Sequence, residues 1–123
     1  MILIPSLFTA TTFLAVHRFI INFTDLPYSN ELNHPYSKQF IRTSQQISDA
    51  LQTILAALPG QYNISIVNYR YQPVIGTLVT IEVTSRKAQP KLRKIIEKAI
   101  RTGYIGGYGV GFDGFQYYTF KGQ

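Results

Sequence analysis

The chain contains no cysteine among its 123 residues, few acidic side chains, and no apolar run long enough to cross a membrane. The absence of cysteine excludes disulfide bonds, zinc–thiolate sites and a cysteine nucleophile. It leaves the compartment open, because a domain with a sufficient core is secreted without disulfides. With 46% hydrophobic and 15% charged residues, the composition is that of one globular domain and not of a disordered chain.

The acidic and histidine side chains are too scattered to predict an enzyme. The six Asp and Glu residues show no paired or metal-ligand spacing, and His17 and His34 fall apart, on a predicted strand and in a predicted turn. Gly109–Gly114 has the letters of the dinucleotide fingerprint, but it follows a predicted helix and precedes a predicted strand, the reverse of what phosphate binding requires. The sequence therefore predicts no catalytic residue, no metal and no cofactor.

Positive charge is in excess, with 12 Lys and Arg against 6 Asp and Glu and a formal charge of +6. This excess attracts polyanions such as nucleic acid, sulfated glycans or anionic lipid. Four cations recur at helical spacing opposite an apolar stripe, namely Lys91, Lys94, Lys98 and Arg101. Two interpretations stay open for this basic row: a surface that binds a sulfated glycan or other extracellular polyanion, and an ordinary solvated helix face.

Residues 1–15 are apolar and are predicted to form a leader or an N-terminal arm ahead of a domain over 16–121. Their length and apolarity suit a secretory signal, although they lack a positively charged start and a small-residue cleavage site. The run is too short for a membrane span and is interrupted by Pro5.

Hydrophobic periodicity divides the rest of the chain into six elements. Apolar and polar residues alternate, as in half-buried strands, over 16–23, 62–66, 78–83 and 115–120. Helical spacing appears over 35–58 and from Pro90 to a stop at Gly103. A connection through Arg70–Pro73 joins the middle strands in a hairpin, and 103–114 is predicted to be loop. The order βαββαβ predicts an α+β ferredoxin-like sandwich, a four-stranded antiparallel sheet with both helices on one face.

The start of this domain carries an ordered set of motifs: the strand Phe19–Phe23, a turn with Tyr28, and Asn33–Ser37 followed by Phe40. This block resembles the opening of a SEA domain, an extracellular module of mucins, agrin, perlecan and membrane-anchored proteases. The resemblance extends over about His17–Lys121, and SEA domains share the βαββαβ arrangement.

The perlecan-type, uncleaved SEA module is the most similar member, through Ile21–Thr24 and Gly114–Tyr117. The resemblance implies a secreted or cell-surface protein, a matrix proteoglycan or a cell-surface glycoprotein. In that setting the domain is expected to be non-enzymatic, and to serve as a folded spacer or interaction domain beside glycosylated regions.

The resemblance also points to the pair Gly76 and Thr77, where self-cleaving SEA domains carry Gly-Ser. In those domains backbone strain drives the hydroxyl onto the preceding carbonyl, and water then hydrolyses the ester. Here the hydroxyl belongs to the stiffer, β-branched threonine, and the connection is expected to be longer and less strained. We therefore expect an uncleaved domain; the alternative is a self-cleaving domain of a mucin or receptor stalk.

Two N-glycosylation sequons occur, at Asn22 and Asn63, each expected to face away from its apolar strand neighbours. A rival from another class is an intracellular nucleic-acid-binding module on the same scaffold. It requires aromatic side chains on the first and third strands, and the third strand, Leu78–Val83, has none. We therefore expect no nucleic-acid partner.

Overall fold

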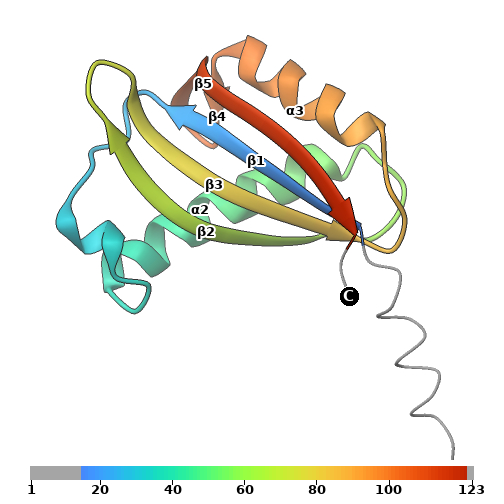
Figure 1. Ribbon diagram of the computed structural model, residues 1–123, viewed down its shortest axis with the longest axis horizontal. Coiled ribbons are helices and arrows are strands. Elements are labelled where there is room, and N and C mark those ends of the chain that lie inside the picture. The colour runs from blue at the N-terminus through green and yellow to red at the C-terminus, as the bar shows by residue number, and fades with distance from the viewer. Residues whose placement is uncertain (1–14, 122–123) are drawn as a thin grey trace, which may run out of the picture.

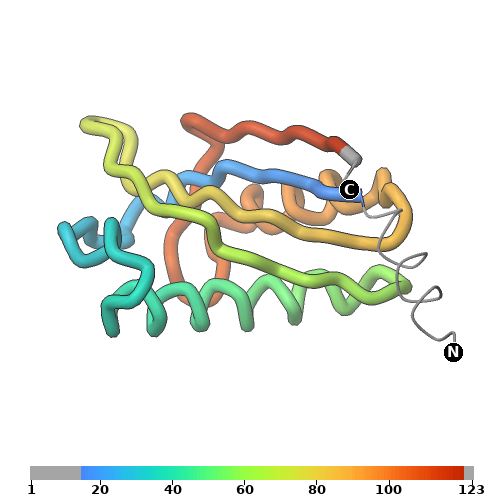
Figure 2. Tube along the Cα trace, turned by 60° about the horizontal axis from the view of Figure 1, so that its bottom comes forward, coloured from blue at the N-terminus to red at the C-terminus, as the bar shows by residue number. Residues whose placement is uncertain are grey.

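The computed structural model describes residues 15–121, which form a curled antiparallel sheet with both helices on one face (Figure 2). Figure 1 views the molecule from the uncovered face of the sheet, with the helices behind it. The sheet order is β2-β3-β1-β5-β4. The elements are β1 (Ala15–Phe23), the 3-10 helix η1 (Asn30–Asn33), α2 (Lys38–Leu55), β2 (Asn63–Gln72), β3 (Gly76–Ser85), α3 (Lys91–Thr102), β4 (Tyr104–Ile105) and β5 (Tyr108–Lys121).

Strand β1 lies at the centre of the sheet, paired with β3 on one side and β5 on the other. Its alternating side chains Phe19, Ile21 and Phe23 are fully buried against the helices, as the sequence predicts. This strand therefore anchors the core on which both helices pack.

The helices begin and end at residues whose chemistry explains the boundaries. Ser37 precedes α2, and its hydroxyl accepts a hydrogen bond from the Phe40 amide at 3.1 Å. This cap places the helix start at Lys38, three residues later than predicted. Helix α3 follows Pro90 and ends at Gly103, whose φ of 93° is the left-handed conformation common after a helix.

The sheet has five strands and not the predicted four, because the Gly-rich segment is not a loop. A tight turn at Gly106 and Gly107, both with positive φ, joins β4 to β5. Strand β5 then runs from Tyr108 to Lys121, with a register shift opposite Ile20–Asn22 and a positive φ at Gly114 that bends it. The glycines thus serve a hairpin and a bent strand.

The connection between β2 and β3 is also shorter than predicted. Strand β2 continues to Gln72, so Arg70 to Gln72 are strand residues and only Pro73–Ile75 remain as the turn. Val74 takes a φ of 75°, which is strained for a β-branched residue. The expected long, relaxed connection at this point is therefore wrong.

The two ends of the described domain lie side by side. Ala15 pairs with Lys121 in the β1–β5 ladder, so the chain enters and leaves at the same end (Figure 1). The β2–β3 hairpin lies at the opposite end of the sheet.

Candidate functional site

The described residues contain no cluster of three or more His, Cys, Asp or Glu side chains able to hold a metal ion. The two histidines are far apart in the fold: His34 is exposed in a turn, and His17 is buried on β1. His17 Nδ1 lies 3.0 Å from the Tyr117 hydroxyl oxygen, and burial lowers the pKa of the imidazole. His17 is buried, and Tyr117 packs against the hydrophobic core, so the structure gives this pair a place in the packing of the domain.

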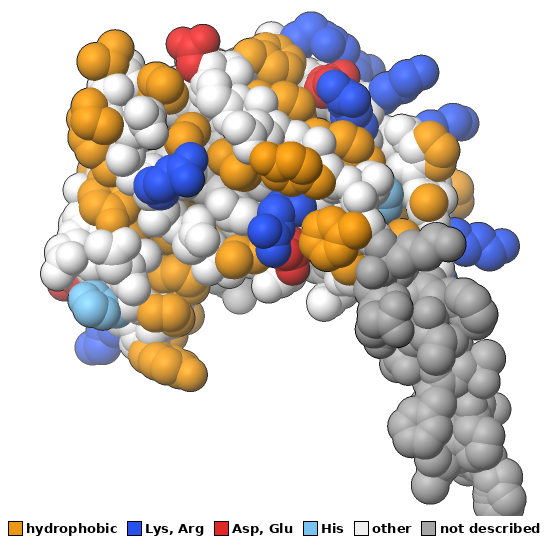
Figure 3. All heavy atoms as spheres, viewed as in Figure 1, with side chains coloured by type: hydrophobic (Ala, Val, Ile, Leu, Met, Phe, Trp, Pro, Cys, Tyr) orange, Lys and Arg blue, Asp and Glu red, His pale blue; other side chains and the backbone are white. Residues whose placement is uncertain are grey.

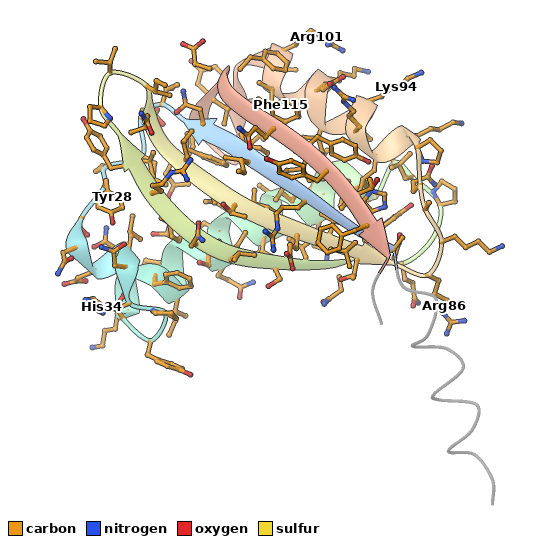
Figure 4. The ribbon with its side chains drawn as sticks, viewed as in Figure 1. Tyr28, His34, Arg86, Lys94, Arg101 and Phe115 are labelled. Carbon is orange, nitrogen blue, oxygen red and sulfur yellow. The ribbon has the colours of Figure 1, made fainter. Side chains whose placement is uncertain are left out.

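The basic row on α3 is exposed along its whole length, as predicted. Lys91, Lys94, Lys98 and Arg101 all face solvent, while Leu92, Ile96 and Ile100 are buried against the sheet. Figure 3 shows cationic side chains gathered over α3, and Figure 4 shows Lys94 and Arg101 projecting outward from it. The row is available to a ligand in solution.

Charge is distributed unevenly along the chain. The segment 86–101, which we call the basic segment, holds seven of the twelve Lys and Arg residues and only one of the six carboxylates. Its formal charge is therefore +6, equal to that of the whole chain, and the remaining residues are balanced. A long-range attraction for an anionic ligand is thus directed at one part of the molecule.

The single carboxylate of the basic segment, Glu97, is paired inside the helix. Its Oε2 accepts from Arg93 Nε at 2.9 Å, one turn away. The guanidinium of Arg93 also lies 5.3 Å from the centre of the Tyr117 ring. The four cations of the basic row consequently have no carboxylate partner among residues 15–121.

Asn63 is exposed at the first position of β2, as its sequon requires. It lies on the rim of an open groove of about 640 Å³ between two connections. One wall is 59–63, which ends in the first residue of β2, and the other is 84–89, which begins with the last two residues of β3. Arg86 and Lys87 belong to the second wall, which the pairing of Asn63 with Thr84 brings next to the first. No local sequence pattern predicts this groove.

Asn22, the other sequon asparagine, is buried, with only 1% of its surface exposed. It faces away from the helices, but the β2–β3 hairpin covers it, and its Nδ2 donates to the Ile75 carbonyl at 3.0 Å. A Cβ on Gly76 would lie 2.4 Å from Asn22 Oδ1, so the glycine permits this close approach. Asn22 thus points away from its apolar neighbours, as expected, but its burial leaves no room for the predicted glycan.

The Thr77 hydroxyl is engaged away from the Gly76–Thr77 bond. The side chain is 1% exposed, and its Oγ1 donates to the Leu26 carbonyl at 2.7 Å. Backbone strain is nevertheless present nearby, at Val74, whose φ is 75°. Acyl transfer needs a hydroxyl that can reach the preceding carbonyl, and the Thr77 hydroxyl is held by Leu26 instead.

The uncovered face of the sheet has exposed aromatics on β5 and none on β3. Tyr118 and Phe120 are half-exposed, and the Arg18 guanidinium lies 5.8 Å from the centre of the Phe120 ring while pairing with Glu82. On β3 this face carries Thr80 and Glu82. A nucleic-acid-binding module of this kind needs an aromatic ring on β3 for base stacking, and β3 instead presents the Glu82 carboxylate on this face.

The model of one family, the SEA domain, matches residues 15–103. The chain belongs to the SEA domain family. Among curated proteins, none matches the chain. One solved structure with some similarity is a hydantoinase/carbamoylase family amidase from Burkholderia ambifaria, with a TM-score of 0.43 and 14% identity over 93% of this chain. The chain covers 29% of the amidase, and a likeness this weak carries no functional argument.

SEA domains occur in extracellular or cell-surface proteins and are generally non-enzymatic, self-cleavage apart. The SEA match contains both sequons, Gly76–Thr77 and the entire basic row, and it ends at Gly103, before β5 completes the sheet. Within residues 15–121, neither helix is long and apolar enough to cross a membrane.

Proposed function

We propose that this SEA domain is an uncleaved, non-enzymatic interaction module of a secreted matrix proteoglycan or cell-surface glycoprotein, of the perlecan type, and that its basic segment binds a sulfated glycan. The observation that carries the proposal is the concentration of the whole net charge of +6 between Arg86 and Arg101. An evenly basic protein would attract polyanions without a defined site, whereas this molecule directs the attraction to α3.

The geometry of α3 supports a linear polyanion as the ligand. Twelve helical residues extend about 18 Å, and the four cations of the basic row lie at intervals of three or four residues along that length. A glycan with regularly spaced sulfates can place successive sulfate groups beside successive cations of this row. A nucleic acid is also a linear polyanion, but α3 carries no aromatic side chain on which its bases could stack.

The environment of Thr77 supports the uncleaved state. Attack on the Gly76 carbonyl requires the hydroxyl to leave its buried hydrogen bond to Leu26, a cost of about 1–3 kcal/mol before chemistry begins. Strain at Val74 lies two residues before Gly76 and outside the peptide bond to be cleaved.

The position of the chain ends favours an interaction role over an in-line spacer role. Ala15 pairs directly with Lys121, so the folded domain adds little distance between the segments that flank it and projects sideways from them. The order of the four long strands, β2-β3-β1-β5, with both helices on one face, supports a ferredoxin-like description of this projecting domain.

Asn63 is the glycosylation site that we propose for this module. Its side chain is exposed within a complete sequon, while Asn22 is buried.

Salt elution from a heparin column tests the proposal. In the row variant, Lys91, Lys94, Lys98 and Arg101 are changed to Gln; in the control variant, Lys38, Arg42, Arg70 and Lys121 are changed to Gln. Both lose the same charge, so only location differs. We expect the row variant to elute at clearly lower salt, with the slope of log affinity against log salt reduced by about four. Equal elution of the two variants would refute a localised site.

A further inference from the structure

We infer that the groove between 59–63 and 84–89 is the end of the glycan-binding track, and that a glycan on Asn63 closes it. This inference rests on the proposed function, because it extends the binding site from α3 and assigns its regulation. In its bare form the domain would bind a sulfated chain along α3 and in the groove. In its Asn63-glycosylated form only α3 would remain available.

The groove is preformed by hydrogen bonds within and between its walls. Gln89 Nε2 donates to the Tyr62 hydroxyl at 3.4 Å, and Thr84 Oγ1 donates to the Asn63 carbonyl at 3.3 Å. Both ends of the second wall are thus joined to the adjacent residues Tyr62 and Asn63 of the first. Within the second wall, Ser85 Oγ donates to the Lys87 carbonyl at 2.6 Å. A volume of about 640 Å³ lies within the range of small-ligand sites and suits a short oligosaccharide.

The lining of the groove selects an anionic sugar. Arg86 and Lys87 are exposed on one wall, and no carboxylate lines the groove. Tyr62 contributes a partly buried ring, and Asn63 and Gln89 contribute amides, which match sugar hydroxyls. Sulfate or carboxylate groups on a sugar would meet the two cations, and the neutral part of the ring would meet the polar wall.

The groove is continuous with the basic row. Its wall ends at Gln89, whose Oε1 accepts from the Lys91 amide at 3.2 Å, and Lys91 is the first residue of α3. In Figure 4 the labelled side chains of Arg101, Lys94 and Arg86 follow one border of the molecule, the first two from α3 and the third from the groove wall. A single extended chain can therefore contact both parts.

A glycan on Asn63 would control whether a ligand can enter the groove. It lines the groove itself and is exposed, so an N-linked glycan would begin on the groove rim. Such a glycan is neutral at its core and larger than the groove, so it would screen Arg86 and Lys87 from an incoming chain without altering their charge.

The absence of cysteine allows a direct test that does not depend on cellular glycosylation. Asn63→Cys protein from bacteria is labelled with a glycan-sized polyethylene glycol maleimide. Tyr36→Cys, at a position 93% exposed before the start of α2, is the matched labelling control. We expect the label on Asn63→Cys to lower the salt of heparin elution and to reduce the salt slope by about two, the contacts of Arg86 and Lys87. The label on Tyr36→Cys should change neither.

The double variant Arg86→Gln, Lys87→Gln should elute from heparin at lower salt, with the same reduction of the salt slope. When Asn63→Cys is added to this double variant, labelling the cysteine should not lower the elution salt further. In secretory cells, Ser65→Ala removes the sequon but retains Asn63, so this variant should elute at higher salt than the glycosylated wild type.

Two results would overturn the inference: unchanged elution after labelling of Asn63→Cys, or no glycan mass on Asn63 in secreted protein. If these occur while the row variant still binds less tightly than its charge-matched control, the groove is excluded and the proposed function stands. If the row variant and its control elute together, the proposed function itself fails.

Discussion

Acidification should destabilise this domain through His17. The imidazole is 1% exposed, its Nδ1 faces the Tyr117 hydroxyl, and its Nε2 has no hydrogen-bond partner among the described residues. Burial lowers the pKa of His17 from its usual 6.5, because the imidazolium would lose its hydration. Neither Tyr117 nor the nearby Arg93 supplies a negative charge to compensate.

The sign of the effect follows from proton linkage. The unfolded chain binds a proton at His17 more tightly than the folded one, so folding is favoured fully above pH 6.5. This contribution is lost as the pH falls below 6.5 toward the lowered folded-state pKa. One group changes the free energy of unfolding by at most about 1.4 kcal/mol per pH unit, and we expect a loss of up to about 1 kcal/mol between pH 6.5 and 5.5.

Urea unfolding measured at several pH values across this window makes the test. The wild type is compared with His17→Leu, which fills a similar volume without a titrating group, and with His34→Leu, which removes the exposed histidine. The wild type and His34→Leu should both lose stability on acidification, while His17→Leu should lose clearly less. Parallel pH profiles for the wild type and His17→Leu would show that the buried imidazole is not the cause.

Three further outcomes are expected. Gly76→Ala should lower the free energy of unfolding in urea by about 2–4 kcal/mol, since its Cβ would lie 2.4 Å from Asn22 Oδ1. Gly103→Ala, which also has a positive φ but has open space around it, should cost about 1 kcal/mol, and equal costs would contradict the close-packing argument. Thr77→Val should lose about 1–3 kcal/mol with the buried hydrogen bond, and Thr77→Ser should still run as one band in denaturing electrophoresis, so two fragments would contradict the uncleaved assignment. In secreted protein, Asn63→Gln should remove all N-glycan mass, and a mass loss in Asn22→Gln would show that Asn22 is accessible.

The elements predicted correctly from the sequence are those whose periodicity directly records burial. In β1 the residues Phe19, Ile21 and Phe23 recur at every second position and are fully buried. In α3 one apolar stripe ends at Gly103. Each pattern predicts one type of element. The exposed basic row on α3 follows from the same stripe, since the cations occupy the opposite side.

The loop predicted over 103–114 is an error that arises because glycines needed for close packing give the same sequence pattern as a flexible loop. A Cβ on Gly106 would lie 2.7 Å from Ala50 Cβ, and one on Gly109 would lie 3.0 Å from Thr24 Oγ1. These glycines allow the β4–β5 hairpin to approach α2 and the end of β1 closely. Composition alone cannot distinguish this use from a flexible connection.

The burial of Asn22 and the groove beside Asn63, neither of which the sequence predicted, have a different origin. Asn22 is covered by the hairpin around Ile75, which lies 53 positions away along the chain. The groove likewise forms because β2–β3 pairing brings Asn63 to Thr84. Both depend on tertiary contacts that local patterns do not encode.

The pairing of Ala15 with Lys121 has a mechanical consequence. When the flanking segments are pulled apart, tension acts across the first hydrogen bonds between β1 and β5 and opens them one pair at a time, like a zipper, instead of loading the whole ladder in shear. Because β1 is the central strand, peeling it away would uncover Phe19, Ile21 and Phe23 together. A module built in this way yields to a small stretching load and, once open, exposes the core of its own fold.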